Sequence, residues 1–213
     1  MKIFLLLAGD YAAPAVLPQA GDAVIAVDGG IRHAARLGVV PDLWLGDFDS
    51  SDAALIAQYA DVPRRTFPAD KDQTDFELAL DWVAQTYDEG TLHVIGSGGD
   101  EADHAFANVW VLAQSRLPVV LWQKNAVIVA AHGEFQMHFA APSGSKVSLF
   151  ATTPLHGVST QGLRWPLRDE SLAPFVARAA RNEALQNEIG VGWRAGYGLV
   201  FLPEGAKDLS INS

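Results

Sequence analysis

The sequence has no cysteine and no long hydrophobic run. The absence of cysteine among 213 residues excludes disulfide bonds, thiolate metal sites and cysteine nucleophiles, so a metal site must use oxygen or imidazole ligands. No stretch approaches the roughly 18 apolar residues of a membrane span. The apolar run after Met1 and Lys2 is broken at Gly9 and Asp10, too early for a signal peptide. We therefore expect a cytoplasmic protein with no membrane partner.

Positive charge is scarce. The chain has 15 Lys and Arg against 25 Asp and Glu, which gives a formal net charge of -10. Nucleic-acid binders need a basic surface for their phosphate contacts, so this balance argues against a nucleic-acid partner and favours small ligands. An acidic protein that handles a polyphosphate must invert its own field locally, and clustered aspartates do so by recruiting Mg²⁺. The alternative is that surface acidity only aids solubility.

The first part of the chain alternates short apolar runs with amphipathic segments. Apolar residues repeat at helical spacing in two of these segments, 76–83 and 106–113. Strands and helices in alternation predict a three-layer α/β domain with a mostly parallel sheet over residues 1–123. The predicted strands are Ile3 to Ala8, Ala23 to Val27, Leu43 to Leu45, Val62 to Phe67, Leu92 to Ile95 and Pro118 to Trp122.

The pattern changes at about residue 124. Phe135, Met137 and Phe139 alternate with polar residues, and several further short apolar runs are separated by Gly, Pro or Asn without long helices between them. These signals predict an all-β sandwich domain over residues 124–213. The alanine-rich piece from Leu172 to Ala184 is either a helix or a long connecting loop.

Acidic residues follow two of the predicted strands. Asp47 and Asp49 stand in Gly46-Asp47-Phe48-Asp49-Ser50 after Leu43 to Leu45, and Asp28 precedes Gly29 and Gly30 after Ala23 to Val27. The carboxyl ends of parallel strands share one crevice, and neighbouring carboxylates repel unless a cation or strong donors hold them. We therefore predict a Mg²⁺ site here. The two glycines allow a ligand to approach the backbone, although an isolated Asp-Gly-Gly is more often a turn.

Two helix starts carry further polar groups. Thr74 and Glu77 have capping-box spacing, and that cap places Asp72, Thr74 and Asp75 beside Lys71, where they can face a polyphosphate. Asp103 stands where the next helix needs an N-cap, after the glycine-rich turn 96–99. The neighbouring His104 is either a phosphate donor, a general acid or a structural residue.

An aromatic residue lies between turn-forming residues in the second half of the chain. The segment is Gly162-Leu163-Arg164-Trp165-Pro166-Leu167. The indole face of Trp165 can stack on a flat heterocycle or hold a cationic ring. The alternative is an aromatic of the core or of an interface.

Taken together and in order, these motifs resemble the thiamine pyrophosphokinase family over nearly the whole chain. The resemblance lies in Val27-Asp28-Gly29-Gly30, Gly46-Asp47-Phe48-Asp49-Ser50, Lys71-Asp72-Gln73-Thr74-Asp75, Gly98-Gly99 with Asp103-His104 and Asn108, the Trp165 segment, and Asn182-Glu183. No single motif is specific, but their ordered combination is.

The resemblance implies a Mg²⁺-dependent transfer of pyrophosphate from ATP, as co-substrate, to the hydroxyl of thiamine, which gives thiamine diphosphate and AMP. It also implies a homodimer whose thiamine sites lie between subunits. Carried across by motif, the metal ligands would be Asp28, Asp47, Asp49, Asp72 and Asp75. Asp49, Asp72, Asp75, Lys71 and Asp103 would form the catalytic group, with Asp75 or Asp103 as acceptor of the alcohol proton. Gly29, Gly30, Gln73, Thr74 and His104 would bind nucleotide together with Asp28, and Trp165 and Asn182 would bind thiamine.

Two departures from the family pattern stand out. The glycine-rich loop of the family contains an arginine that is absent here, and the basic residues that are candidates to replace it are Arg32, Arg64, Arg65 and Lys124. The family also tends to have serine before the Asn-Glu pair, where this chain has Arg181.

Two other functions fit the same acidic loops. One is a Mg²⁺-dependent hydrolase of nucleotides or phosphate esters, which would turn over ATP without an organic acceptor. The other is a non-catalytic sensor of thiamine or a nucleotide, which would bind thiamine without releasing AMP.

Overall fold

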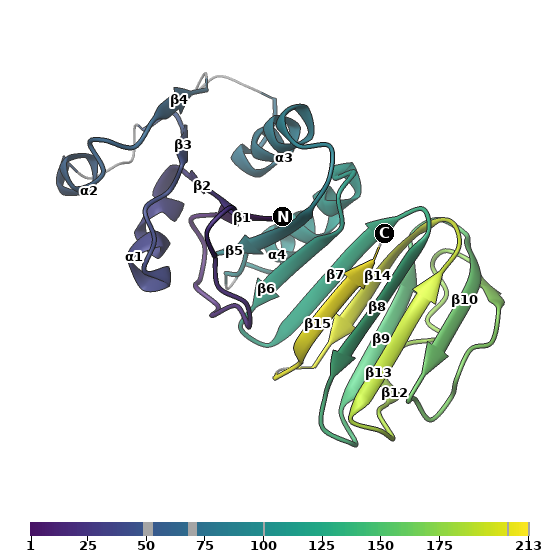
Figure 1. Ribbon diagram of the computed structural model, residues 1–213. Helices are drawn as coiled ribbons and strands as arrows, with labels where there is room; N and C mark the ends of the chain where they lie inside the picture. The colour runs from purple at the N-terminus through teal and green to yellow at the C-terminus, as the bar shows by residue number, and fades with distance from the viewer. Residues whose placement is uncertain (49–52, 68–71, 100, 204, 213) are drawn as a thin grey trace. The chain divides into compact units, whose positions relative to one another are not determined.

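The computed structural model describes residues 1–48, 53–67, 72–99, 101–203 and 205–212. The contacts within the chain divide it into two compact units (Figure 1). Unit 1 comprises Met1–Leu117 and Leu121–Lys124, and unit 2 comprises Pro118–Val120 and Asn125–Ser213.

Unit 1 is built on a sheet whose strands run in the order β6-β5-β1-β2-β3-β4. All pairings from β5 to β4 are parallel, so the predicted mostly parallel sheet is confirmed. The strands are β1 (Lys2–Leu6), β2 (Ala23–Val27), β3 (Leu43–Gly46), β4 (Arg64–Thr66), β5 (Thr91–Ile95) and β6 (Val119–Gln123). Because β1 lies between β2 and β5, the chain changes direction across the sheet at β1, which is where open α/β sheets form their ligand crevice.

Short helical segments connect these strands. They are η1 (Asp28–His33), α1 (Ala34–Leu37), α2 (Ala53–Gln58), α3 (Asp75–Thr86), α4 (Ala102–Trp110) and η2 (Val111–Gln114). The predicted apolar face of α3 is confirmed, since Phe76, Ala79, Leu80 and Val83 are its buried residues. The predicted capping box is confirmed too: the Thr74 side chain accepts from the Glu77 N–H while Glu77 accepts from the Thr74 N–H.

The prediction for α4 is wrong about its buried face. Phe106 and Trp110 are 66% and 61% exposed and stack on each other with ring centroids 5.9 Å apart. The buried residue of this helix is Asn108, whose side-chain amide donates to the Ser97 carbonyl at 2.8 Å. The face of α4 that is turned inwards therefore carries the polar residue Asn108, whereas the apolar spacing predicted a hydrophobic face there.

Unit 2 contains two antiparallel sheets, in agreement with the predicted all-β sandwich. One has the order β12-β9-β14-β7 and the other β11-β10-β13-β8-β15. The strands are β7 (Ala126–His132), β8 (Phe135–Ala140), β9 (Lys146–Ala151), β10 (Leu155–Gln161), β11 (Glu170–Leu172), β12 (Asn182–Glu183), β13 (Glu188–Trp193), β14 (Tyr197–Leu202) and β15 (Lys207–Asn212). The alternation predicted for β8 is confirmed, because Phe135, Met137 and Phe139 are buried.

The alanine-rich piece from Leu172 to Ala184 is a connection. It consists of turns and irregular backbone followed by the two-residue strand β12, so the loop alternative is the correct one. Across the described part of the chain, the structure contains no helix that is both long enough and apolar enough to cross a membrane.

Candidate functional site

A pocket of about 500 Å³ opens in unit 1 where β1, β2 and β5 end. Its walls come from the segments that follow these strands and from the starts of α3 and α4. The residues that line it are Leu7, Ala8, Gly9, Val27, Asp28, Gly29, Arg32, Thr74, Asp75, Phe76, Gly96, Gly98, His104, Ala107, Asn108 and Val111. Five of the predicted ligand-binding or catalytic residues therefore lie around one cavity: Asp28, Gly29, Thr74, Asp75 and His104.

Asp28 is the first residue after β2 and is held by the main chain around it. Its carboxylate Oδ1 accepts from the Asp47 N–H at 3.2 Å, and its carbonyl oxygen accepts from the Trp44 indole N–H at 2.9 Å. A Cβ atom on Gly46 would lie 1.9 Å from Oδ1 of Asp28. The glycine of the Gly-Asp-Phe-Asp segment is thus required for the Asp28 side chain to reach the end of β3.

The carboxyl groups of Asp28 and Asp75 share a hydrogen bond. Burial of Asp28, together with the neighbouring carboxylates of Asp75 and Asp47, raises the pKa of Asp28 to about 7. Two carboxyl groups this close need a proton or a cation between them. Carboxylate oxygens are the ligands that Mg²⁺ prefers, so the donor set around Asp28 fits a hard divalent ion.

Other predicted residues near α3 are placed differently. Asp72 is exposed and does not line the pocket. Gln73 is also exposed, and its amide donates to Oδ2 of Asp81 at 3.0 Å. Thr74 lines the pocket while it caps α3, so its structural and its predicted ligand-binding roles are compatible.

Gly30 is buried beneath the pocket and does not line it. The floor comes instead from the segments after β1 and β5, where the Gly9 N–H donates to the Gly96 carbonyl at 2.7 Å and the Asp10 N–H donates to the Gly98 carbonyl at 2.9 Å. Gly9 was not among the predicted site residues. The rule that identified Asp28, a residue that directly follows an apolar strand, applies to Gly9 as well, because Gly9 follows the predicted strand Ile3 to Ala8.

The start of α4 differs from the prediction. The N-cap is Glu101, so Asp103 lies in the first turn, where its carboxylate accepts from the His104 N–H at 2.9 Å. The helix begins earlier than the N-cap prediction for Asp103 required, and that prediction is wrong. Asp103 is exposed and absent from the pocket wall, whereas His104 and Asn108 line it.

Trp165 lies in unit 2 on the segment between β10 and β11. Trp165 is 61% exposed, and the Arg164 guanidinium carbon lies 5.8 Å from the centroid of its ring. The core alternative is therefore excluded. The buried Asn182 accepts from the Trp165 N–H at 3.1 Å and donates to the Trp165 carbonyl at 2.7 Å, so Asn182 fixes the main chain that carries the indole.

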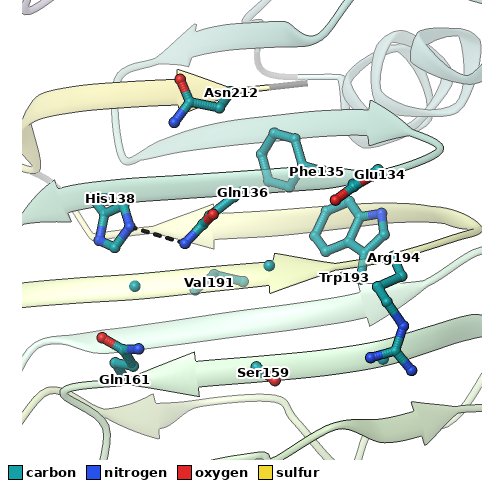
Figure 2. Close-up of a pocket in the computed structure, with 13 residues that line it drawn as sticks. Glu134, Phe135, Gln136, His138, Ser159, Gln161, Val191, Trp193, Arg194 and Asn212 are labelled. Carbon is teal, nitrogen blue, oxygen red and sulfur yellow. Dashed lines mark hydrogen bonds between the residues drawn. The ribbon is translucent and has the colours of Figure 1, made fainter.

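Unit 2 also has a shallow trough of about 460 Å³ on the outer face of its five-stranded sheet. Figure 2 shows Gln136 and His138 on one side of β13 and Ser159 and Gln161 on the other, with the Gln136–His138 contact of 3.3 Å drawn as a dashed line. Glu134 is the one carboxylate among its lining residues. The trough therefore lacks the paired acids that a metal-polyphosphate site needs.

Asp49 and Lys71, two of the predicted catalytic residues, lie outside the described residues. Within the described ranges, no three His, Cys, Asp or Glu side chains are grouped so that they would enclose a metal ion. The Asp28 and Asp75 pair is the acidic centre that the described residues provide.

A family model described as "Thiamin pyrophosphokinase, catalytic domain" matches residues 16–133, which is more than half of the chain. The chain is 26% identical over 151 residues to the thiamine pyrophosphokinase of Bacillus subtilis (strain 168), covering 68% of this chain and 70% of that protein.

Two solved structures have the same fold. The crystal structure of thiamine pyrophosphokinase from Bacillus subtilis superposes with a TM-score of 0.76 at 21% identity, covering 98% of this chain and 100% of that one. A thiamin pyrophosphokinase family protein from Enterococcus faecalis gives a TM-score of 0.77 at 21% identity, covering 96% and 99%.

Proposed function

Because this chain belongs to the thiamin pyrophosphokinase family, we propose that it transfers pyrophosphate from ATP to the hydroxyl of thiamine and forms thiamine diphosphate and AMP. The observation that carries the proposal is the Asp28 and Asp75 carboxyl pair in the wall of a strand-end pocket. We assign the phosphate chemistry to residues 1–123 and thiamine binding to residues 124–213.

In this reaction the thiamine hydroxyl oxygen attacks the β-phosphorus of ATP. A new bond forms between oxygen and phosphorus, the bond from the β-phosphorus to the oxygen bridging the α-phosphate breaks, and AMP leaves with that electron pair. Phosphoryl-type transfers need little covalent work from a protein, so positioning and charge neutralisation supply most of the rate enhancement. The acidic and glycine-rich pocket in unit 1 is suited to both.

The proposed metal is Mg²⁺, with Asp28 and Asp75, which line the pocket, as its first ligands and with Asp47, Asp49 and Asp72 as further predicted ones. When bound, Mg²⁺ would neutralise charge on the phosphate oxygens. Of the two candidates for acceptor of the alcohol proton, the geometry favours Asp75, because Asp75 lines the pocket and Asp103 does not. Lys71 stays a predicted second source of positive charge.

The test is incubation of the protein with ATP, Mg²⁺ and thiamine, with AMP and thiamine diphosphate measured together. We expect the two products in equal amounts and neither product when Mg²⁺ is removed with a chelator. ATP turnover that does not depend on thiamine would instead identify the hydrolase. Thiamine binding with no AMP release would identify the sensor.

Trp165 gives a second prediction, about thiamine. Replacing Trp165 with alanine removes an exposed indole, which we expect to raise the KM for thiamine about 10-fold because stacking on an aromatic contributes on the order of 1 kcal/mol or more. The KM for ATP should change less than 2-fold. Steady-state kinetics with each substrate varied in turn measures both, and Phe106→Ala, which removes another exposed aromatic, is the control. Equal changes in the two KM values would remove the stacking role.

The homodimer implied by the family resemblance is part of the same proposal. Sedimentation equilibrium of the full chain measures the mass directly, and a single species at twice 22.8 kDa is the expected result. We also keep the cytoplasm as the proposed location.

A further inference from the structure

Arg32 has an unusual place at the pocket, because its guanidinium lies across a glycine. Its Nε–H donates to the Gly29 carbonyl at 2.6 Å. A Cβ atom on Gly29 would lie 2.3 Å from Nη2 of Arg32. The second residue of the Asp-Gly-Gly segment must therefore lack a side chain for Arg32 to lie where it does, directly after β2.

Two cavities share Arg32. It lines the strand-end pocket with Asp28 and Asp75, and it also lines an adjoining cavity of about 490 Å³ that includes Tyr11 and Arg36. Ala8, Gly9, Gly98 and His104 line both cavities as well, so a ligand that occupies the two would lie near Arg32.

The Arg32 guanidinium has N–H donors that are available to a ligand. In the ranges that the structure describes, Arg32 forms no ion pair with a carboxylate, whereas Arg164 and Arg178 in unit 2 pair with Glu183 and Glu170 at 2.5 Å. The hydrogen bond to Gly29 uses Nε and leaves the N–H groups of both Nη atoms for a ligand. A guanidinium fixed by one bond and open at its other end is suited to phosphate oxygens.

The other basic residues considered as replacements for the absent glycine-loop arginine lie elsewhere. Arg64 donates to the Ile56 carbonyl at 3.1 Å and lies over the rings of Trp44 and Phe48. Neither Arg64, Arg65 nor Lys124 lines either cavity. Among these four, Arg32 is the residue that the fold brings to the pocket.

We infer that Arg32 binds the phosphate chain of the nucleotide and that Gly29 is kept small to position it. This inference rests on the proposed function and adds a specific nucleotide-binding role to the same pocket. The carboxylates bind the phosphate oxygens only through a metal, so Arg32 supplies a direct positive contact. It acts on the nucleotide and leaves thiamine binding unchanged.

The first test replaces Arg32 with alanine. We expect the KM for ATP and the Kd for Mg·ATP, measured by calorimetry without thiamine, to rise about 10- to 100-fold, the range for a lost charge-assisted hydrogen bond. The KM for thiamine should stay within about 2-fold. Arg32→Lys keeps the charge but loses the planar fork, so it should give an intermediate rise. The control is Arg116→Ala, which removes the same charge from another exposed position of unit 1.

The second test replaces Gly29 with alanine, which displaces the guanidinium while the arginine remains. It should raise the KM for ATP in the same direction as Arg32→Ala. The double variant should bind ATP no more weakly than Arg32→Ala alone, because both substitutions remove the same interaction. Additive effects of the two substitutions would overturn the link between Gly29 and Arg32.

The outcomes separate this inference from the proposed function. If the wild-type protein forms thiamine diphosphate and Arg32→Ala and Arg32→Lys both keep its affinity for ATP, the role of Arg32 is overturned. An equal loss in Arg116→Ala overturns it as well, since the effect would then be general electrostatics. If the wild-type protein binds Mg·ATP in an Arg32-dependent way but forms no thiamine diphosphate, the inference stands and the proposed function fails.

Discussion

Asp28→Asn is expected to remove nearly all pyrophosphate transfer and, at the same time, to stabilise the metal-free protein at pH 8. The loss of activity should reach about 1,000-fold, because the substitution removes a carboxylate from the site proposed for Mg²⁺ and the phosphates. The gain in stability follows from the carboxyl pair. At pH 8 the metal-free protein holds the Asp28 and Asp75 carboxylates together without a proton between them, and an asparagine amide donates to Asp75 without that repulsion.

The pH dependence has a definite sign. The pKa of Asp28 is raised from 3.8 to about 7 in the folded protein, so the folded state binds a proton that the unfolded chain has already lost between these values. The stability contributed by this group is therefore present in full below pH 3.8 and declines as the pH rises towards 7. Asp28 is only half-buried, and after allowance for solvent screening the decline amounts to about 1–2 kcal/mol.

Thermal denaturation in a chelator checks this prediction. The variant should melt above the wild type at pH 8, and the difference should shrink towards pH 5, where Asp28 is protonated and resembles asparagine. Mg²⁺ should raise the melting temperature of the wild type at pH 8 more than that of the variant. Asp88→Asn, at an exposed position of unit 1, controls for the change in net charge. Retention of a tenth of the activity by Asp28→Asn would rule out the proposed metal site.

Gly30→Ala is expected to have the largest effect on stability. A Cβ atom there would lie 1.9 Å from the Leu6 carbonyl oxygen and 2.8 Å from the Leu7 carbonyl carbon. Both contacts are with backbone of the buried strand segment, so η1 would have to move away from β1. We expect a cost of about 3 kcal/mol or more, which for a chain of this size lowers the melting temperature by roughly 6–12 °C.

Gly38→Ala is the matched comparison for Gly30→Ala. Gly38 ends α1 in the left-handed region at φ 70°, and a Cβ atom there would meet nothing within 4 Å. Its replacement should cost about 1 kcal/mol, from backbone conformation alone. Urea denaturation followed by circular dichroism compares the two variants. A smaller cost for Gly30→Ala than for Gly38→Ala would show that η1 is free to move off β1.

The strand-end rule predicted one part of the acidic centre: Asp28 follows β2 and lines the pocket, whereas Asp47 does not line it and Asp49 lies outside the described residues. Asp75 lies 47 positions further along the chain, and it reaches the same pocket because the capping box places it at the start of α3. The same reasoning worked for α3, whose apolar positions and cap agree with each other.

It failed where a single polar contact decides the outcome. Apolar spacing over 106–113 predicted an amphipathic helix, but Phe106 and Trp110 on its apolar face are exposed, and the buried residue of α4 is Asn108, which donates to the Ser97 carbonyl. The choice among four basic residues could not be made from the sequence either. It depends on the 3-10 turn of η1, which brings the Arg32 side chain back over Gly29, and spacing alone does not reveal such a turn.

Asn182 holds the main chain of Trp165 in place without contacting the ring through a hydrogen bond. The Asn182 amide makes two hydrogen bonds to main-chain atoms of Trp165 and accepts a third from the Glu183 N–H, and none of the three involves the indole. Phenylalanine, tyrosine or histidine introduced at this position would therefore stand on an unchanged support. Under the proposed role of Trp165, exchanging the ring at this position would change which heterocycle the protein accepts while the pocket of unit 1 is left untouched.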